Sequence, residues 1–220
     1  MKCVVTAGPT YEPLDKVRRI TNFSTGRLGT ELANFLAGRG HDVILLIGEM
    51  ATWGGPRQAR DVRKFTTSQN LADMLRGLAG QGVDAVFHAA AVSDFGAGKS
   101  YRRSGDGELA EIKAGKIGTR DGSLLVELVP TAKIISQLRE WFPEASLVGW
   151  KYEVDGSRED AIAKARQQIV ECRTDGCVAN GPAYGLGFGV VTEKREAMHY
   201  RGMDALFEGL ERLVSPKGDR

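Results

Sequence analysis

Residues 6–26 read TAGPTYEPLDKVRRITNFSTG, and this stretch decides how the chain begins to fold. An apolar segment, residues 3–5, precedes it, and a helical pattern of apolar residues over 28–36 follows it. A loop between a first strand and a first helix is where open α/β sheets bind ligand groups. This loop carries hydroxyl, amide and guanidinium groups and ends at the backbone amides of a helix start, so it suits an anion. It lacks G-x-G-x-x-G and is longer than a dinucleotide turn, so the NAD fingerprint is absent.

Strand and helix patterns alternate along the rest of the chain, and several strands are continuous apolar runs, which is typical of parallel strands covered on both faces. We predict strands at residues 2–6, 42–48, 61–66, 85–90, 124–128, 147–152 and 176–180, and helices at residues 27–37, 68–78, 132–141, 158–172 and 203–213. The fold class is therefore α/β: a doubly wound, Rossmann-like, mostly parallel sheet with helices on both faces. A small antiparallel ribbon is expected late in the chain, at residues 189–192 and 197–200.

Residues 95–123 interrupt the alternation, because they are rich in glycine and in basic side chains. Long segments of this kind in compact domains are usually functional lids or disordered. We expect a mobile basic loop here, within one α/β domain that spans residues 1–220.

Composition narrows the class of protein. The chain has 220 residues, of which 42% are hydrophobic and 26% charged, as in ordinary globular proteins. The net charge of +2 does not suggest nucleic acid as a partner. No apolar run approaches the roughly 18 residues that span a bilayer, and a strand pattern begins at once, so neither a membrane segment nor a signal peptide is expected. Three cysteines without metal spacing indicate free thiols in a reducing cytoplasm.

The opening motif resembles that of the phosphopantothenoylcysteine synthetase family, the second half of the bacterial coenzyme A flavoprotein. The family pattern is roughly T-[AS]-G-x-T-x-E-x-[IL]-D-x-V-R-x-[IL]-[ST]-N-x-S-[ST]-G. Further segments match in the family's order: AAAVSD at 89–94, Lys116-Ile117, a strand and turn at 124–135, VGWK at 148–151 and VAN at 178–180. The resemblance covers residues 2–192.

This resemblance implies a cytoplasmic ligase that joins 4′-phosphopantothenate to cysteine. A nucleoside triphosphate, CTP or ATP, with Mg²⁺ activates the pantothenate carboxylate as an acyl-nucleotide, and the cysteine amine then displaces the nucleotide. The family also implies a homodimer that the late ribbon helps to build. No flavin site is expected, so the chain is either a standalone synthetase or works beside a separate flavin-dependent decarboxylase.

The resemblance also assigns residues. The catalytic assignments are Asn22 at the acyl-nucleotide, Lys116 at the phosphates and Arg18 as a phosphate or carboxylate contact. The nucleotide-binding set is Gly8, Ser24, Thr25, Gly26, Ala89, Ala90, Ala91, Asp94, Lys116, Ala132, Lys133, Ile134, Ile135 and Trp150.

Each assignment has a plain alternative. Asp94 either contacts the ribose or base, helps to hold Mg²⁺, or caps a turn, and no other metal ligand is assigned. Asn22 is also a common helix N-cap or turn residue, and Lys116 a common exposed loop residue. Trp150 either stacks on the base or packs in the core. His88, just before the alanines, is more typical of a structural histidine.

The chain departs from the family after the first motif. Lys116-Ile117 is followed by Gly118, where further lysines are usual. Two helix lysines of many CTP-dependent members correspond to Gln168 and Cys172, and the groups that could substitute for them are Lys164, Arg166, Arg173 or the loop at 99–120. ATP-dependent eukaryotic relatives also lack those two lysines and have a lysine after the VGF-type strand, where this chain has Lys151. An alternative function is therefore a synthetase-like protein that binds nucleotide or phosphate without full catalysis. An NAD(P)-dependent reductase, with Glu49 on a ribose, is a weaker alternative.

Overall fold

The computed structural model describes residues 1–113, 115–118 and 122–215, and its core is an eight-stranded sheet in the order β13-β12-β11-β10-β6-β1-β4-β5. Six neighbouring strands are parallel, and the last two form an antiparallel ribbon at one edge. The parallel strands are β1 (Lys2–Ala7), β4 (Asp42–Gly48), β5 (Asp61–Phe65), β6 (Ala85–His88), β10 (Ser146–Tyr152) and β11 (Gly176–Asn180), and the ribbon is β12 (Phe188–Val191) with β13 (Met198–Tyr200). The predicted fold class and the late ribbon are confirmed.

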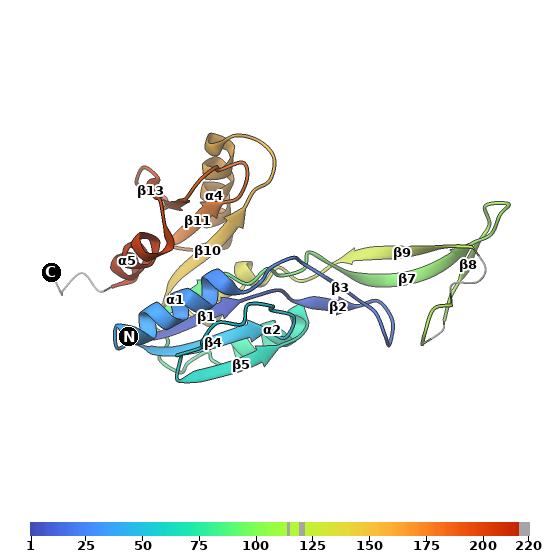
Figure 1. Cartoon of the computed structure of the whole chain (residues 1–220), viewed down its shortest axis with the longest axis horizontal. Coiled ribbons are helices and arrows are strands. Elements are labelled where there is room, and N and C mark those ends of the chain that lie inside the picture. The colour runs from blue at the N-terminus through green and yellow to red at the C-terminus, as the bar shows by residue number, and fades with distance from the viewer. Residues whose placement is uncertain (114, 119–121, 216–220) are drawn as a thin grey trace.

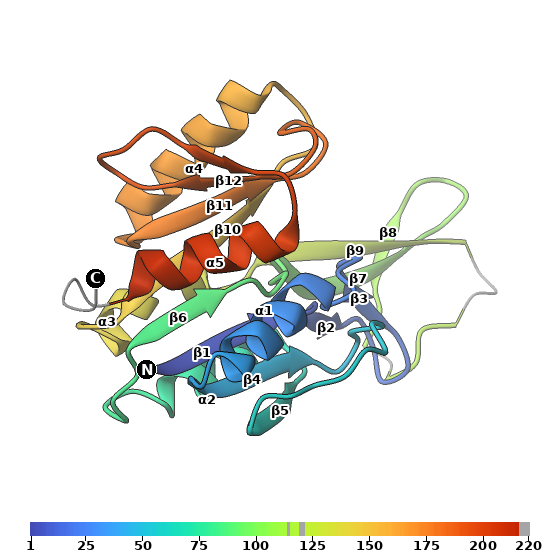
Figure 2. The same cartoon turned by 60° about the vertical axis from the view of Figure 1, so that its left-hand side comes forward.

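Helices cover both faces of this sheet (Figure 2). The helices α1 (Arg27–Gly38) and α5 (Met203–Val214) pack on one face, where Cys3, Val5 and Ala7 of β1 point. The helices α2 (Ser68–Arg76), α3 (Leu138–Trp141) and α4 (Arg158–Cys172) pack on the other, together with the short 3₁₀ helix η1 (Ile134–Ser136). Because side chains alternate along a strand, an apolar run such as β1 supplies both cores. The predicted helix at 132–141 is real only in part, as η1 and α3.

A three-stranded antiparallel arm projects from the body (Figure 1). It consists of β7 (Phe95–Arg103), β8 (Leu109–Glu111) and β9 (Ser123–Pro130) in the order β8-β7-β9. The prediction of a loop over 95–123 is therefore wrong where β7 and β8 form, while residues 114 and 119–121 lie outside the described part and mobility stays a prediction. The predicted strand at 124–128 exists as part of β9, but in the arm and not in the central sheet. Both faces of the arm are largely exposed, so no buried face imposes an alternating pattern.

A short hairpin, β2 (Tyr11–Pro13) and β3 (Arg19–Thr21), lies within the first loop and extends in the same direction as the arm (Figure 1). Its closing turn, residues 14–18, reaches the segment 115–117 that follows β8.

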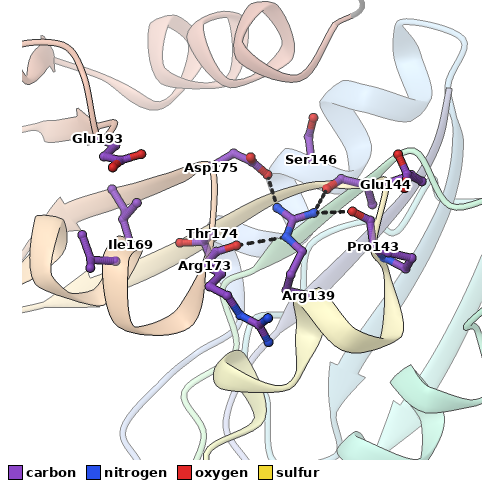
Figure 3. A pocket seen from close by; sticks show the side chains of 11 residues that line it. Arg139, Pro143, Glu144, Ser146, Ile169, Arg173, Thr174, Asp175 and Glu193 are labelled. Atoms are coloured by element: carbon purple, nitrogen blue, oxygen red, sulfur yellow. Dashed lines mark hydrogen bonds and ion pairs between the residues drawn. The ribbon is translucent and has the colours of Figure 1, made fainter.

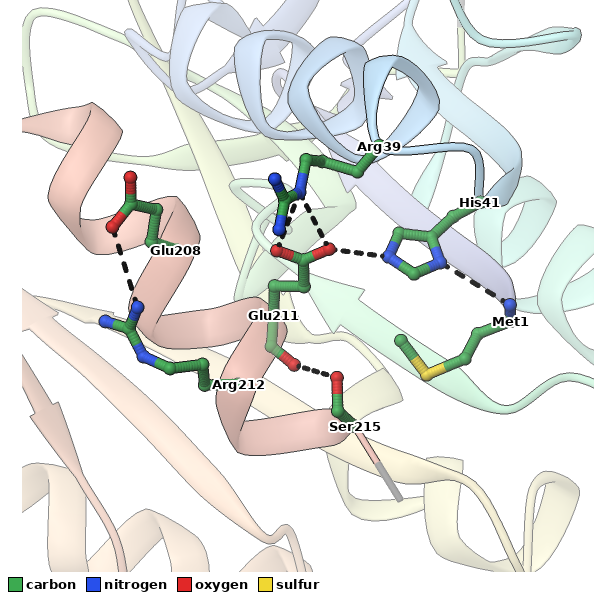
Figure 4. A network of polar contacts seen from close by, with 7 residues as sticks. All are labelled: Met1, Arg39, His41, Glu208, Glu211, Arg212 and Ser215. Carbon is green, nitrogen blue, oxygen red and sulfur yellow. Dashed lines mark hydrogen bonds and ion pairs between the residues drawn. The ribbon is translucent and has the colours of Figure 1, made fainter. Parts of the chain in front are cut away.

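A polar clamp joins α5 to the loop after α1 (Figure 4). Glu211 of α5 accepts hydrogen bonds from His41 at 2.9 Å and from Arg39 at 3.2 Å. Burial opposes ionisation of Glu211, but these hydrogen bonds outweigh it and hold the pKa of this carboxyl below its usual range. The clamp therefore fixes the last helix against the first α/β unit. Among the described residues, no helix is both long and apolar enough to cross a membrane.

Candidate functional site

The first loop and the alanine segment meet where β1 and β6 end. Backbone pairing continues past both strands, because Ala91 N donates to Gly8 O at 2.9 Å and Thr10 N donates to Ala91 O at 3.1 Å. Gly8 has a φ of +77° and packs so tightly that an added Cβ would lie 2.8 Å from Ala51 Cβ. Gly8 and residues 89–91, which the sequence assigned to one site, therefore lie side by side at the carboxyl edge of the sheet, where ligands bind in such folds.

The amino end of α1 points to the same place. Its N-cap is Gly26, with a φ of +80°, and an added Cβ there would lie 3.3 Å from Gly8 Cα. Arg27 N donates to Thr25 Oγ1 at 3.3 Å, and the first turn of the helix holds no acidic residue. Ser24 is half-buried and Thr25 exposed. The helix start thus offers amides and hydroxyls without a resident carboxylate, which favours an anion.

Asn22 is tied to the alanine segment. Its Nδ2 donates to Ala91 O at 3.1 Å and to Val92 O at 3.3 Å. The side-chain amide is therefore not a helix cap, and the protein uses its hydrogens. What remains for a ligand is Oδ1, an acceptor, which suits an amine or hydroxyl more than a carbonyl.

Arg18 and Lys116 are brought together by the hairpin turn. Arg18 Nη2 donates to Ile117 O at 2.6 Å, and Asp15 accepts from Ile117 N at 3.2 Å. The hydrogen bond from Val17 N, with those from Ile117 and Arg18, holds the pKa of Asp15 below its usual range. Lys116 is exposed beside Ile117. None of the hydrogen bonds or ion pairs of the described residues joins Lys116 to the alanine segment or to Asn22.

Asp94 follows the alanine segment and lies beside the segment that leads into η1. Its backbone carbonyl accepts from Thr131 N at 3.0 Å, and its carboxylate is exposed. No hydrogen-bond donor among the described residues contacts that carboxylate, so it does not cap a turn there. Ala132 and Lys133 are exposed, whereas Ile134 and Ile135 are buried in the core of the α2 face. The two isoleucines can therefore contact a ligand only through their backbone.

A cleft of about 290 Å³ opens where β10 ends, between η1 and α4. Three lysines line it. Lys164 Nζ lies 2.5 Å and Lys151 Nζ 3.6 Å from the carboxylate of Glu153, and Lys133 Nζ lies 3.9 Å from Glu171. The hydrogen bond from Lys164 holds the pKa of Glu153 below its usual range. Sequence reasoning assigned only Lys133 to the site and missed Glu153.

The positions where many family members carry lysines do not supply charge. Gln168 and Cys172 are 8% and 1% exposed, and Gln168 Nε2 donates to Cys177 Sγ at 3.3 Å. Lys164, one turn before Gln168, takes part in the cleft, whereas Arg173 lines a different one and Arg166 donates to Arg195 O.

Two polar atoms at the ends of β10 and β11 are buried without a hydrogen-bond partner: Nε1 of Trp150 and Oδ1 of Asn180. Trp150 pairs in register with Val178, so Trp150 and Asn180 lie on the same face of the sheet. The indole packs against the α1 and α5 core, which supports a core role for the ring. Its unpaired N–H and the nearby amide oxygen are a donor and an acceptor that a bound ligand would satisfy. The sequence identifies Asn180 only as part of a segment that matches the family. Its burial in the fold is what marks its side chain as a candidate ligand contact.

A larger cleft, about 600 Å³, lies at the opposite, amino end of β10 and contains none of the predicted site residues (Figure 3). Arg139 crosses it and donates to the carbonyls of Phe142, Pro143, Ala145 and Arg173 and to the carboxylate of Asp175. Its guanidinium is occupied by the protein itself. No cluster of three or more potential metal ligands occurs in the described part of the chain.

Known proteins share this architecture. The chain is 34% identical over 180 residues to the coenzyme A biosynthesis bifunctional protein CoaBC of Thermococcus kodakarensis, covering 81% of this chain and 41% of that protein. It is 31% identical over 225 residues to the protein of the same name from Bacillus subtilis, covering 96% and 50%. The chain thus spans half or less of the length of these relatives.

A crystal structure of the DNA/pantothenate metabolism flavoprotein from Streptococcus pneumoniae superposes with a TM-score of 0.82 at 26% identity, over 97% of this chain and 98% of that one. Residues 1–208 match the family model of the DNA/pantothenate metabolism flavoprotein C-terminal domain. The resemblance of residues 6–26 is therefore confirmed along almost the whole chain, which belongs to the family of DNA/pantothenate metabolism flavoprotein C-terminal domains.

Proposed function

We propose that the chain joins 4′-phosphopantothenate to cysteine through an acyl-nucleotide, forming phosphopantothenoylcysteine. The observation that carries this proposal is the meeting of the first loop and the alanine segment at the ends of β1 and β6. There Asn22 is fixed on Ala91 beside the anion-suited start of α1 and the free carboxylate of Asp94. A polyanion and a reacting carbonyl both need such a preorganised polar site.

The pantothenate carboxylate attacks the α-phosphate, pyrophosphate leaves, and the cysteine amine then attacks the acyl carbon and releases the nucleotide monophosphate. In the first step Lys116 offsets charge on the phosphates, and Arg18 beside it binds a phosphate or carboxylate. In the second step Oδ1 of Asn22 accepts a hydrogen bond from the amine and orients it. This role follows from the use of its NH₂ group by Ala91 and Val92.

The nucleotide lies along the carboxyl edge. Backbone groups of residues 132–135 meet the base, and Asp94 meets the ribose or Mg²⁺. Lys133, Lys151 and Lys164 replace the missing helix lysines at the phosphates. The unpaired Nε1 of Trp150 donates to a phosphate oxygen.

Mg²⁺ fits this site as a companion of the triphosphate, because it typically needs only one or two carboxylates in addition to phosphate oxygens. Asp94 is the carboxylate with no donor from the described residues. Bound there, the ion would neutralise phosphate charge.

The first test is pyrophosphate release by the purified chain with phosphopantothenate and Mg²⁺, with CTP and ATP in parallel, with and without cysteine. Release that needs phosphopantothenate supports carboxylate activation, and the better substrate identifies the nucleotide. Lys116→Ala should suppress release, and Asn22→Ala should preserve release but slow amide formation. Lys113→Ala, an exposed lysine of the same segment, is the matched control. Wild-type rates in both site variants would refute the assignments.

The burial of Gln168 and Cys172 favours one alternative, a protein that binds nucleotide without turning it over. Calorimetric binding of CTP or ATP without pyrophosphate release, from folded protein, would establish it in place of the ligase.

We also propose that the protein forms a homodimer in the cytoplasm. Exposed apolar residues occupy both faces of β9, with Leu124 and Leu128 on one and Leu125 and Val129 on the other. Leu186 and Met198, next to and within the late ribbon, are also exposed. Light scattering should show a dimer that Leu128→Glu weakens, whereas a monomeric wild type would refute it.

A further inference from the structure

The backbone pairing of β1 with β6 is interrupted at the alanine segment, and a side chain of β1 supplies a hydrogen bond in its place. Thr6 pairs in register with His88, and the next pairing is between Pro9 and Ala91. In between, Ala89 N turns back to Phe87 O at 3.2 Å. Ala90 N donates instead to the hydroxyl of Thr6, at 3.1 Å. The hydroxyl thus satisfies a backbone donor where the regular pairing of the two strands is interrupted.

His88 determines which way that hydroxyl points. Its Nδ1 lies 3.0 Å from Thr6 Oγ1. Oγ1 accepts from Ala90 N, and Nδ1 is the acceptor that the described residues place within reach of the buried hydroxyl hydrogen. We infer that the hydroxyl donates to Nδ1, with the imidazole hydrogen on Nε2, because the other tautomer would leave the hydroxyl hydrogen without an acceptor. His88 is 6% exposed, and burial lowers its pKa to about 4, so the ring is neutral and accepts this bond at ordinary pH.

The backbone of the alanine segment connects these hydrogen bonds to the candidate site. Residue 91 follows directly, and its carbonyl accepts both Thr10 N and Nδ2 of Asn22. Displacement of Ala90 would therefore move the carbonyl on which Asn22 is mounted.

We propose that His88 is a positioning residue, which through the Thr6 hydroxyl and Ala90 N–H fixes the alanine segment and thereby the orientation of Asn22. This inference rests on the proposed function, because it takes Asn22 and the alanine segment to be part of the ligase site.

Four variants and one control test the proposal. Thr6→Val removes the hydroxyl while keeping the shape, and Thr6→Ser retains it. His88→Leu removes the acceptor, and His88→Asn restores one, because Oδ1 of asparagine takes the place of Nδ1. Val86→Ala is the control, since Val86 is buried on the same strand and face, two residues before His88.

Structure is measured first, by ¹⁵N NMR, which does not depend on activity. The wild type should show an unprotonated Nδ1 and a hydrogen on Nε2. His88→Leu and Thr6→Val should shift the amide signals of Ala90 and of the Asn22 side chain, and Val86→Ala should not. A protonated Nδ1 in the wild type at neutral pH, or unchanged Asn22 signals in both variants, would overturn the proposal even if the chain proves not to be a ligase.

Kinetics follow. His88→Leu and Thr6→Val should lower kcat for amide formation about tenfold with little change in nucleotide KM, and His88→Asn and Thr6→Ser should recover most of it. Added to Asn22→Ala, His88→Leu should cause little further loss. Equal losses in His88→Leu and Val86→Ala, or full additivity with Asn22→Ala, would show that His88 is only a core residue.

Discussion

Two clefts lie at opposite ends of β10, and the larger one is the poorer candidate for ligand binding. At the amino end, a cleft of about 600 Å³ surrounds Arg139, whose guanidinium donates hydrogen bonds to four carbonyls and one carboxylate. At the carboxyl end, a cleft of about 290 Å³ contains three lysines, whose ammonium groups pair, among the residues that the structure describes, with Glu153 and Glu171 alone. Each ammonium has three donors, so these lysines keep hydrogens for a ligand. Spare donors on charged side chains, and not volume, make the smaller cleft the better candidate for binding an anion.

The largest expected effect is on stability at the amino end. Arg139→Leu should lower the free energy of unfolding by about 4 kcal/mol, because it leaves several carbonyls without their donor and takes one of two donors from Asp175, which keeps Leu147 N. Activity per folded molecule should not change. Urea denaturation measures the first quantity and pyrophosphate release the second. The control is Arg212→Leu, because Arg212 is exposed and pairs with Glu208, one turn away on the same helix; this variant should stay within about 0.5 kcal/mol of wild type. A stable Arg139→Leu with weakened substrate binding would make the amino-end cleft a binding site.

The second effect is acid sensitivity at the carboxyl end, through His88. Its pKa is about 4 in the folded protein and near 6.5 unfolded, so the unfolded chain takes up the proton first. The stability that comes from the neutral ring is complete above pH 6.5 and is lost as pH falls toward 4, by about 3 kcal/mol in total. Other groups titrate in that range, so the measurement is the difference in unfolding free energy between wild type and His88→Asn at pH 7, 5.5 and 4.5. A constant difference would show that His88 is not buried neutral.

The sequence and the fold agree best where burial is two-sided. The runs that became β1, β4, β10 and β11 are apolar because both faces of the sheet are covered, so their prediction needed no knowledge of neighbours. The arm is different. Residues 95–103 form β7 through backbone pairing with β9, and their glycines and basic side chains carry no strand pattern.

The candidate site likewise has one part that the sequence predicts and another part that only the fold reveals. Residues 6–26 and 89–94 could be assigned because each is a continuous motif. Lys151 and Lys164 lie on β10 and α4, and Lys133 lies just before η1, so only the fold brings the three to one cleft. The orphan atoms of Trp150 and Asn180 depend on burial, which a sequence does not display.

The third prediction tests the lysines of the carboxyl-end cleft. Lys151→Met and Lys164→Met keep the aliphatic stem and remove the charge, so each should weaken nucleotide binding about tenfold while stability changes by less than about 1 kcal/mol. Calorimetric titration with CTP and ATP measures the affinity. Arg166→Met is a matched control, because it removes one positive charge from α4 at a residue that does not line the cleft. Equal weakening by Arg166→Met would mean that only net charge matters.

The smallest effect concerns Glu153, whose side chain is 15% exposed between two lysines. Because the hydrogen bond from Lys164 holds its pKa below the usual range, Glu153 is ionised at neutral pH and competes with phosphate for both ammonium groups. Glu153→Gln should therefore tighten nucleotide binding about threefold, and the gain should shrink as salt rises. Glu171→Gln, 3.9 Å from Lys133 at the rim of the same cleft, should gain less. Weaker binding by Glu153→Gln would mean that the carboxylate positions the lysines for the ligand instead of competing with it, and the contrast between the two clefts would then rest on geometry more than on spare donors.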